Sequence, residues 1–239
     1  LFTDEFNGNA LDGKKWYDHH PRWRGRPPAK FVSENVVLKD GNLELRNSVL
    51  KPADGPFNIA GAAIVSKSGQ AFHGYYEVRM KASRISMSST FWMSNESKNG
   101  VSLELDINEA IGEGRRQPDR KHYMKSNAHY WVREGGKRKS YATPGDAKIS
   151  PAAGEAFHLY GAWWVDATTV KFYHNDEYKF TIHPYAELDE TPFDRPMHIN
   201  MVTETYDWET PPTAEELSDD SRNTTYYDWV RAWVLVPKE

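Results

Sequence analysis

The stretch SLELDINE at residues 102–109 decides how the rest of the sequence is interpreted. Its three apolar residues alternate with Ser102, Glu104 and Asp106. Successive side chains of a β-strand point to opposite faces of the sheet, so the apolar residues share one face and the polar residues share the other. We therefore predict a strand with one face packed on a core and one acidic face.

Glu109 lies five positions after Glu104 and would fall on the apolar face of a regular strand. We predict a β-bulge near Ile107 or Asn108 that returns Glu109 to the acidic face. The outer carboxylates would then flank Asp106 at a separation of roughly 5–6 Å, which retaining glycosidases use for a nucleophile and an acid/base. Mutual repulsion raises the pKa of at least one of these carboxyls. A protonated carboxyl can donate to a leaving oxygen while an ionised partner attacks the anomeric carbon, and Asp106 can hydrogen-bond and tune that nucleophile.

Two other interpretations of the acidic strand are open from the sequence. The first alternative is a solvent-exposed polar strand face, because charged side chains usually lie on the surface. Adjacent like charges destabilise a strand, however, and no Lys or Arg alternates with these acids. A Ca²⁺ cluster is the second alternative, but residues 102–109 lack the glycine-bearing loop of an EF-hand. The pattern favours a functional site.

The rest of the chain predicts an all-β protein. The turn signals Lys39-Asp40-Gly41-Asn42 and Asn175-Asp176 fit tight hairpins. The absence of internal repeats and of linker composition favours a single antiparallel β-sandwich domain over residues 1–239 rather than a βαβ array. The segments of strand-like alternation are 36–38, 43–46, 62–66, 74–81, 89–93, 102–109, 126–132, 158–165, 170–174, 178–182, 197–203 and 226–236.

Helical patterning is nearly absent. We predict one short helical turn at residues 213–219, where Pro212 and Thr213 can open it and two glutamates suit its N-terminus. Residues 112–125 are rich in charged residues and glycine, which predicts a long loop directly after the acidic strand. The charged residues of this loop could determine substrate specificity, or they could simply be solvent-exposed.

The composition narrows the classes of chemistry and partner. The chain has 239 residues and no cysteine, so disulfides, thiolate catalysis and cysteine metal sites are excluded. The formal net charge of −4 argues against a nucleic-acid partner. No stretch approaches the roughly 20 apolar residues that span a membrane, and residues 1–8 lack the layout of a signal peptide, so we predict a soluble, already trimmed chain. Aromatic residues make up 13% of the sequence and suit either a core or sugar-stacking platforms.

Motifs along nearly the whole chain resemble one known family. Glu104-x-Asp106-x-x-Glu109 resembles the bulged signature of glycoside hydrolase family 16, which laminarinases, agarases, porphyranases and carrageenases share. Further segments look like this family and follow in the same order. They are 2–8, Leu11-Asp12, Lys15-Trp16, 74–80, 91–93 and 227–231.

The resemblance implies a β-jelly-roll sandwich with an open substrate cleft on its concave face. By position it implies that Glu104 is the nucleophile, Asp106 its assistant and Glu109 the acid/base of a retaining mechanism, which needs no metal or organic cofactor. Members of the family often carry a structural Ca²⁺ on the convex side, where hard oxygen ligands would bind it. The candidate ligands for such an ion are Asp4, Glu5, Gly41 and Asp228.

Residues 23–28 and 200–208 resemble the agarase and porphyranase branch of the family, which cuts β-1,4 linkages in red-algal galactans. Trp23 followed three positions later by Arg26 is similar to the porphyranase arrangement for an L-galactose-6-sulfate unit. An arginine fork suits sulfate oxygens, and an apolar ring suits a sugar face. An ordinary basic loop is the alternative interpretation of this segment.

We expect further substrate contacts on neighbouring strands. His129, Trp131 and Arg133 share one strand face and offer a hydrogen-bonding ring, a stacking platform and a cation. Trp92 suits core or cleft by residue type, and its position just before the acidic strand favours the cleft. The contacts expected from the opposite side are Glu204 and Trp208. The tryptophans assigned mainly to the core are Trp163, Trp164, Trp229 and Trp233.

These observations predict a secreted or cell-surface bacterial endo-β-galactanase that hydrolyses the sulfated galactan porphyran with net retention. We expect a monomer with neither a nucleic-acid nor a membrane partner. A β-agarase is the alternative within the branch. A non-catalytic galactan-binding module is the alternative from another class, although it would not need all three acids. Transglycosylation would use the same residues as hydrolysis.

Overall fold

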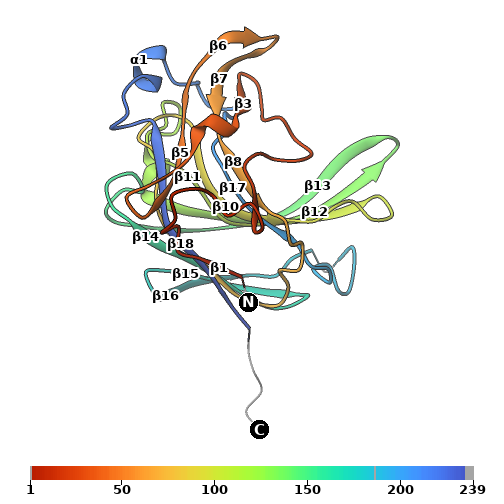
Figure 1. The fold of residues 1–239 in the computed structure, drawn as a ribbon. Coiled ribbons are helices and arrows are strands. Elements are labelled where there is room, and N and C mark those ends of the chain that lie inside the picture. The colour runs from red at the N-terminus through yellow and green to blue at the C-terminus, as the bar shows by residue number, and fades with distance from the viewer. Residues whose placement is uncertain (1, 186, 235–239) are drawn as a thin grey trace.

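The protein is built almost entirely of β-strands, in a computed structural model that describes residues 2–185 and 187–234 (Figure 1). Two large sheets enclose the main core, and a smaller three-stranded sheet stands at the top of the view. No helix within the described ranges is long and apolar enough to cross a bilayer. The predicted antiparallel β-sandwich is confirmed.

The seven-stranded sheet contains the acidic strand β11 as an interior strand, next to the central strand β10. Four strands that follow one another in the chain, β10 to β13, pair antiparallel as a meander. In spatial order the sheet consists of β13 (Lys137–Lys148), β12 (Tyr123–Glu134), β11 (Val101–Ile111), β10 (Ser88–Ser94), β17 (His198–Val202), β8 (Ala63–Ser66) and β2 (Trp16–Tyr17).

The eight-stranded sheet forms the other layer. Three of its strands, β14 to β16, also form a meander in chain order. In spatial order the sheet consists of β16 (Glu177–Ile182), β15 (Thr169–His174), β14 (His158–Asp166), β9 (Gly74–Lys81), β18 (Thr224–Trp233), β5 (Asn42–Arg46) and β4 (Val36–Lys39), and β1 (Thr3–Asp4) pairs with β18.

The third sheet and three short helical segments complete the fold. The sheet has the order β3 (Ala29–Phe31), β7 (Phe57–Gly61) and β6 (Ser48–Asp54), and the helical segments are η1 (Ser33–Asn35), η2 (Pro118–His122) and α1 (Ala214–Leu217). Helix α1 confirms the predicted turn, because Thr213 and Glu216 form a reciprocal capping box. The predicted loop 112–125 is shorter than expected, since η2 and the start of β12 occupy its second half.

The core forms between the inner faces of the two large sheets. The three apolar residues that alternate with the acids in β11 are at most 1% exposed. They meet side chains of the facing sheet such as Val78 and Met80, which are fully buried in the same cluster. Burial of such side chains stabilises the fold by roughly 1.5–3 kcal/mol each. The outward faces of both sheets therefore remain available for ligands.

Both predicted hairpin turns are confirmed. Asp40 and Gly41 have φ values of 52° and 73°, and Asn175 and Asp176 have φ values of 48° and 66°. Two consecutive residues with positive φ are what a type I′ turn requires, and such turns match the twist of the flanking strands. The turn at Asn175 and Asp176 joins β15 to β16.

The assignment of Trp233 to the core is wrong, since its side chain is 42% exposed. Ala232 points into the core, so alternation along β18 directs the next side chain outward. Trp164 is fully buried as predicted, whereas Trp163 and Trp229 are only half-buried. The predicted last strand extends to residue 236, and its residues 235–236 lie outside the described residues.

Candidate active site

The bulge predicted in the acidic strand is present. Two consecutive residues of β10 pair with Asn108 and Asp106, so Ile107 is the extra residue of β11. The bulge shifts the alternation of side chains by one position. Glu109 therefore returns to the outward face that also carries Glu104 and Asp106.

Glu104 and Asp106 form a tight cluster with His129 of β12, because ligand atoms of the three residues lie within 4.8 Å of one another. His129 Nε2 lies 3.3 Å from Asp106 Oδ2 and 3.9 Å from Glu104 Oε1. Trp131 Nε1 donates to Glu104 Oε2 at 3.3 Å. His129 Nδ1 lies 2.6 Å from the hydroxyl of Ser140. These contacts orient the Glu104 carboxylate, whose side chain stays 21% exposed.

Glu109 is held by a residue from a separate segment. The hydroxyl of Tyr206 donates to Glu109 Oε1 at 2.7 Å. The Tyr206 ring stacks on Trp208 with centroids 4.7 Å apart, and the Arg120 guanidinium lies 4.9 Å from the Trp208 centroid. Trp208 therefore acts on the acidic cluster through Tyr206, a residue for which the sequence indicated no individual role.

Glu204 is paired with Arg26, the arginine of the N-terminal motif at residues 23–28. Arg26 Nε donates to Glu204 Oε2 at 2.9 Å. The Glu204 side chain is 8% exposed and that of Arg26 is 39% exposed. The guanidinium also lies 5.5 Å from the Tyr206 ring centroid. Arg26 thus neutralises a buried acid while part of its guanidinium faces solvent.

The acidic cluster shifts the pKa of its members upward. Burial, and then the negative charges of Asp106 and Glu109, raise the pKa of Glu104 to about 8. Burial, Glu109 and Glu204 raise the pKa of Asp106 well above its usual range. Burial also raises the pKa of Glu204 to about 7, although its pairing with Arg26 opposes this shift. The site therefore retains protons near neutral pH.

A pocket of about 590 Å³ lies beside this cluster. Glu104 and four of the predicted substrate contacts line it, namely Trp23, Arg26, Trp92 and Trp131. His20 also lines the pocket and stacks on Trp92 with centroids 6.1 Å apart, although no motif or alternation marks this residue as a candidate. The structure thus brings the N-terminal motif and the acidic strand together.

Of the two arginines in the β12–β13 hairpin, Arg138 rather than the predicted Arg133 lines this pocket. The two arginines are cross-strand partners in the β12–β13 hairpin. The guanidinium of Arg138 lies 3.9 Å from the centroid of the Trp131 ring. Sequence reasoning missed Arg138 because it did not predict β13, and only the pairing register shows that Arg138 returns to the Trp131 side.

The loop after β11 is anchored beside the site. The Glu209 carboxylate accepts hydrogen bonds from the backbone N–H groups of Arg115, Arg116 and Gln117. These bonds lower the pKa of Glu209 despite the opposing effect of burial. The charged loop is therefore attached to the segment that carries Tyr206, which the sequence alone did not indicate.

The four candidate calcium ligands are not gathered into one cluster of acids. Glu5 forms two hydrogen bonds of 2.8 Å with Arg231, and Asp228 pairs with Arg79. Asp4 accepts hydrogen bonds from the Phe6 amide and the Trp16 indole. Gly41 lies beside the Asn7 side chain. Within the described residues, three side chains of the ligand types come together at Glu104, Asp106 and His129 alone, so the calcium site stays a prediction.

Comparisons with known proteins agree on one family. The family model described as "Beta-porphyranase A-D, GH16 domain" matches residues 1–235. The Beta-porphyranase E of Zobellia galactanivorans is 50% identical over 99% of this chain and 87% of its own. The crystal structure of the beta-porphyranase BpGH16B from Bacteroides plebeius superposes with a TM-score of 0.91 at 47% identity, covering 100% of this chain and 91% of that one. An extracellular agarase of Streptomyces coelicolor is 27% identical over 98% of this chain and 82% of its own.

Proposed function

The chain belongs to glycoside hydrolase family 16, in the group described as Beta-porphyranase A-D, and we propose that it hydrolyses internal β-1,4 linkages of porphyran with net retention. This membership confirms the predicted family, the jelly-roll fold and the glycoside hydrolase activity. The identity with a named porphyranase, 50% against 27% for the agarase, favours the sulfated galactan as substrate.

One observation carries the proposal. The bulge at Ile107 puts Glu104, Asp106 and Glu109 on one outward face, and that face borders a pocket with aromatic and arginine side chains. Two carboxyl groups flanking the scissile bond are what glycoside hydrolysis requires. A surface acidic strand without function would have no need of the indole, imidazole and phenol that hold these carboxyls.

In the first step we assign Glu104 as the nucleophile that attacks the anomeric carbon, and Glu109 as the acid that protonates the leaving oxygen. The raised pKa of Asp106 keeps a proton on that residue, which can donate to the Glu104 carboxylate. The Trp131 indole already donates to Glu104. With Asp106 protonated, its negative charge no longer raises the pKa of Glu104, and the two donors stabilise Glu104 in its ionised, nucleophilic form.

In the second step water attacks the glycosyl-enzyme from the side of Glu109, which now accepts the proton of that water. The Tyr206 hydroxyl, 2.7 Å from Glu109 Oε1, fixes the carboxyl for both transfers. The glycosidic bond breaks in the first step, the bond to Glu104 breaks in the second, and the configuration at the anomeric carbon is retained. Transglycosylation would replace the water by a sugar hydroxyl.

The sulfate is recognised by the arginines beside the aromatic rings. Arg26 and Arg138 both line the pocket and both lie against aromatic rings, and a sulfated sugar would stack on Trp23 beside them. A guanidinium group can donate two parallel hydrogen bonds to a pair of anionic oxygens, such as two oxygens of a sulfate. His129 is positioned to hold Glu104 and Asp106 rather than the sulfate.

The proposal is tested by incubating the protein with purified porphyran and with agarose, following reducing ends and product masses over time. Release of short sulfated oligosaccharides from porphyran alone is the expected result. Cleavage of agarose instead would identify a β-agarase and would refute the sulfate assignment. A product longer than the starting oligosaccharide would reveal transglycosylation.

We further propose that the enzyme is secreted or displayed at the cell surface, because a polysaccharide cannot enter a bacterial cell intact. The proposed assembly is a monomer with one catalytic domain over residues 1–239. Fractionation of the producing cells and sedimentation of the purified protein test these two statements.

A further inference from the structure

Three side chains close a ring of contacts around Glu109. The Tyr206 hydroxyl donates to Glu109 Oε1 at 2.7 Å, and the Tyr206 ring stacks on Trp208 with an interplanar angle of 15°. The Arg120 guanidinium lies 4.9 Å from the Trp208 centroid and donates to the backbone carbonyl of Glu109 at 3.5 Å. We call Tyr206, Trp208 and Arg120 the Glu109 support network. It holds this residue both at the carboxyl and at the backbone.

Arg26 joins the Glu109 support network to the pocket beside the acidic cluster. Its guanidinium lies 5.5 Å from the Tyr206 ring centroid, and its Nε donates to Glu204. The Thr205 hydroxyl donates to the backbone carbonyl of Arg26 at 2.7 Å, which ties the arginine to the segment that carries Tyr206. A guanidinium has five N–H donors, and 39% of the Arg26 side chain is exposed. Donors therefore remain for a sulfate in the pocket while Nε stays on Glu204.

The position of Arg120 is unfavourable for stability alone. Its Nε atom is buried and has no hydrogen-bond partner within the described residues. A buried polar group without a partner costs free energy. The contacts that this position provides are those of the guanidinium with the Trp208 indole and with the Glu109 carbonyl. These contacts indicate that the cation serves the acid/base.

The Tyr206 hydroxyl keeps its proton in this environment. Burial, and then the negative charges of Glu109 and Glu204, raise the pKa of Tyr206 well above its usual range, and the charge of Arg120 opposes this shift. The Tyr206 side chain is buried, so bulk water does not compete for the hydroxyl. The hydroxyl is therefore a permanent donor to Glu109. The geometry of this hydrogen bond depends on what packs against the ring.

We propose that Trp208 and Arg120 are positioning residues for the acid/base, and that a sulfate bound at Arg26 acts through the same network to raise kcat. This inference rests on the proposed hydrolysis of porphyran. A sulfate would immobilise the Arg26 guanidinium by charge-assisted hydrogen bonds. The immobilised guanidinium then holds the Tyr206 ring in the orientation that places its hydroxyl on Glu109. Misplacement of a catalytic group slows the chemical step, so the effect belongs to kcat rather than to KM.

The experiment compares porphyran oligosaccharides of one length before and after solvolytic desulfation. The unmodified protein should have the higher kcat on the sulfated substrate. We expect Trp208→Ala and Arg120→Gln each to lower kcat on that substrate by about fivefold, with KM changed by less than about twofold. On the desulfated substrate the loss of kcat should be less than about twofold, because the network then transmits nothing from Arg26. Either variant carries the test if the other does not fold.

Conservative variants separate positioning from folding. Trp208→Phe keeps a ring against Tyr206, and Arg120→Lys keeps the positive charge, so each should recover part of the lost kcat. Lys121→Gln is the matched control, because Lys121 follows Arg120 in η2 and is not part of the network. We expect this control to keep the kcat of the unmodified protein on both substrates.

Four results would overturn the proposal. Equal losses of kcat on both substrates would assign Trp208 and Arg120 to the fold, and a higher KM at unchanged kcat would make Trp208 a plain sugar platform. Equal kcat of the unmodified protein on both substrates would refute the effect of the sulfate while leaving porphyran hydrolysis intact. Failure to cleave the sulfated substrate at all would refute the proposed function and this inference with it.

Discussion

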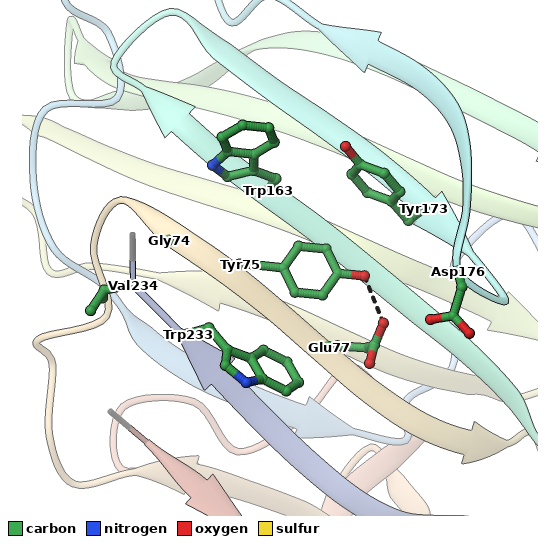
Figure 2. A pocket seen from close by; sticks show the side chains of 8 residues that line it. All are labelled: Gly74, Tyr75, Glu77, Trp163, Tyr173, Asp176, Trp233 and Val234. Atoms are coloured by element: carbon green, nitrogen blue, oxygen red, sulfur yellow. Dashed lines mark hydrogen bonds between the residues drawn. The ribbon is translucent and has the colours of Figure 1, made fainter. Parts of the chain in front are cut away.

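The cleft and a second pocket, on the outward face of the eight-stranded sheet, are built from similar rings, but the charges between those rings are opposite (Figure 2). We call this second pocket, of about 720 Å³, the outer aromatic pocket, and its rings are those of Tyr75, Trp163, Tyr173 and Trp233. In the cleft, Arg26 and Arg138 lie against the aromatic side chains. In the outer aromatic pocket, Glu77 and Asp176 take that place. Rings supply stacking area to any pyranose, so they do not distinguish one galactan from another. We therefore expect the charge between the rings to select the sugar in the cleft, and the outer aromatic pocket serves as an internal control.

Replacement of Glu104 by Gln gives the largest expected difference between the two regions. The variant should lose at least about 10³-fold in kcat on porphyran, because an amide cannot form the glycosyl-enzyme. Trp233→Ala, in the outer aromatic pocket, should keep kcat within about twofold of the unmodified protein. Reducing-end assays measure both effects. Glu134→Gln, an exposed acid on β12, is the control, and normal activity of the Glu104 variant would refute the assigned nucleophile.

Removal of the Arg26 guanidinium should separate sulfated from unsulfated substrates. Hydrogen bonds to charged groups contribute about 1.5–3 kcal/mol, so Arg26→Ala should lower kcat/KM on porphyran by about 100-fold. Arg26→Lys should recover only part of this loss, because Lys lacks the planar fork. The double variant Arg26→Ala/Glu204→Gln removes the unpaired acid that the single change leaves. Equal losses on porphyran and on an uncharged galactan would show that Arg26 supports the fold rather than the sulfate.

Loss of the Tyr206 hydroxyl should have an intermediate effect confined to the cleft. Tyr206→Phe removes the hydrogen bond to Glu109, and we expect about a fivefold loss of kcat on porphyran, since one positioned hydrogen bond contributes about 1 kcal/mol. Aryl galactosides with good leaving groups need less protonation and should lose less. Kinetics on both substrates test this prediction, with Tyr178→Phe as the control. An equal loss on both substrates would contradict a role in positioning the acid.

The pH dependence of stability gives the smallest effect. Glu104 and Glu204 have pKa values raised to about 8 and about 7, so the folded protein binds more protons than the unfolded chain between about pH 4.5 and 8. Stability contributed by these groups is present below about pH 4.5 and is lost as the pH rises through their folded-state pKa values. We expect Glu104→Gln to raise Tm at pH 8 by about 5 °C and to have little effect at pH 5. A thermal melt at both pH values decides this, and an equal shift at both would contradict it.

The acidic strand and its bulge could be predicted because they depend on local alternation. Three apolar residues fix one face of β11, and Glu109 is out of phase with that pattern, so only an extra residue can restore it. The hairpin turns were equally local, since their residues tolerate positive φ. The family motifs added the roles of the three acids, which alternation alone does not assign.

The rest of the site depends on pairing between segments that are distant in the sequence. Arg138 reaches the cleft through the register of β13, a strand with few apolar residues and an internal Pro144-Gly145 pair, which hide it in the sequence. The hydrogen bond between Tyr206 and Glu109 joins residues 97 positions apart. Trp163 and Trp164 are neighbours in sequence and point to opposite faces of β14, so residue type alone could not assign both to the core.

The strand that contributes Arg138 to the cleft is also an edge strand of the seven-stranded sheet. β13 is the terminal strand in the order of that sheet, and an open edge of this kind can pair with another chain and start aggregation. Lys137, Arg138 and Lys139 are exposed along it, and Pro144 removes one backbone donor. These three positive charges, of which Arg138 also lines the cleft, therefore keep the protein dispersed. Variants that exchange them for neutral residues to change specificity should become less soluble.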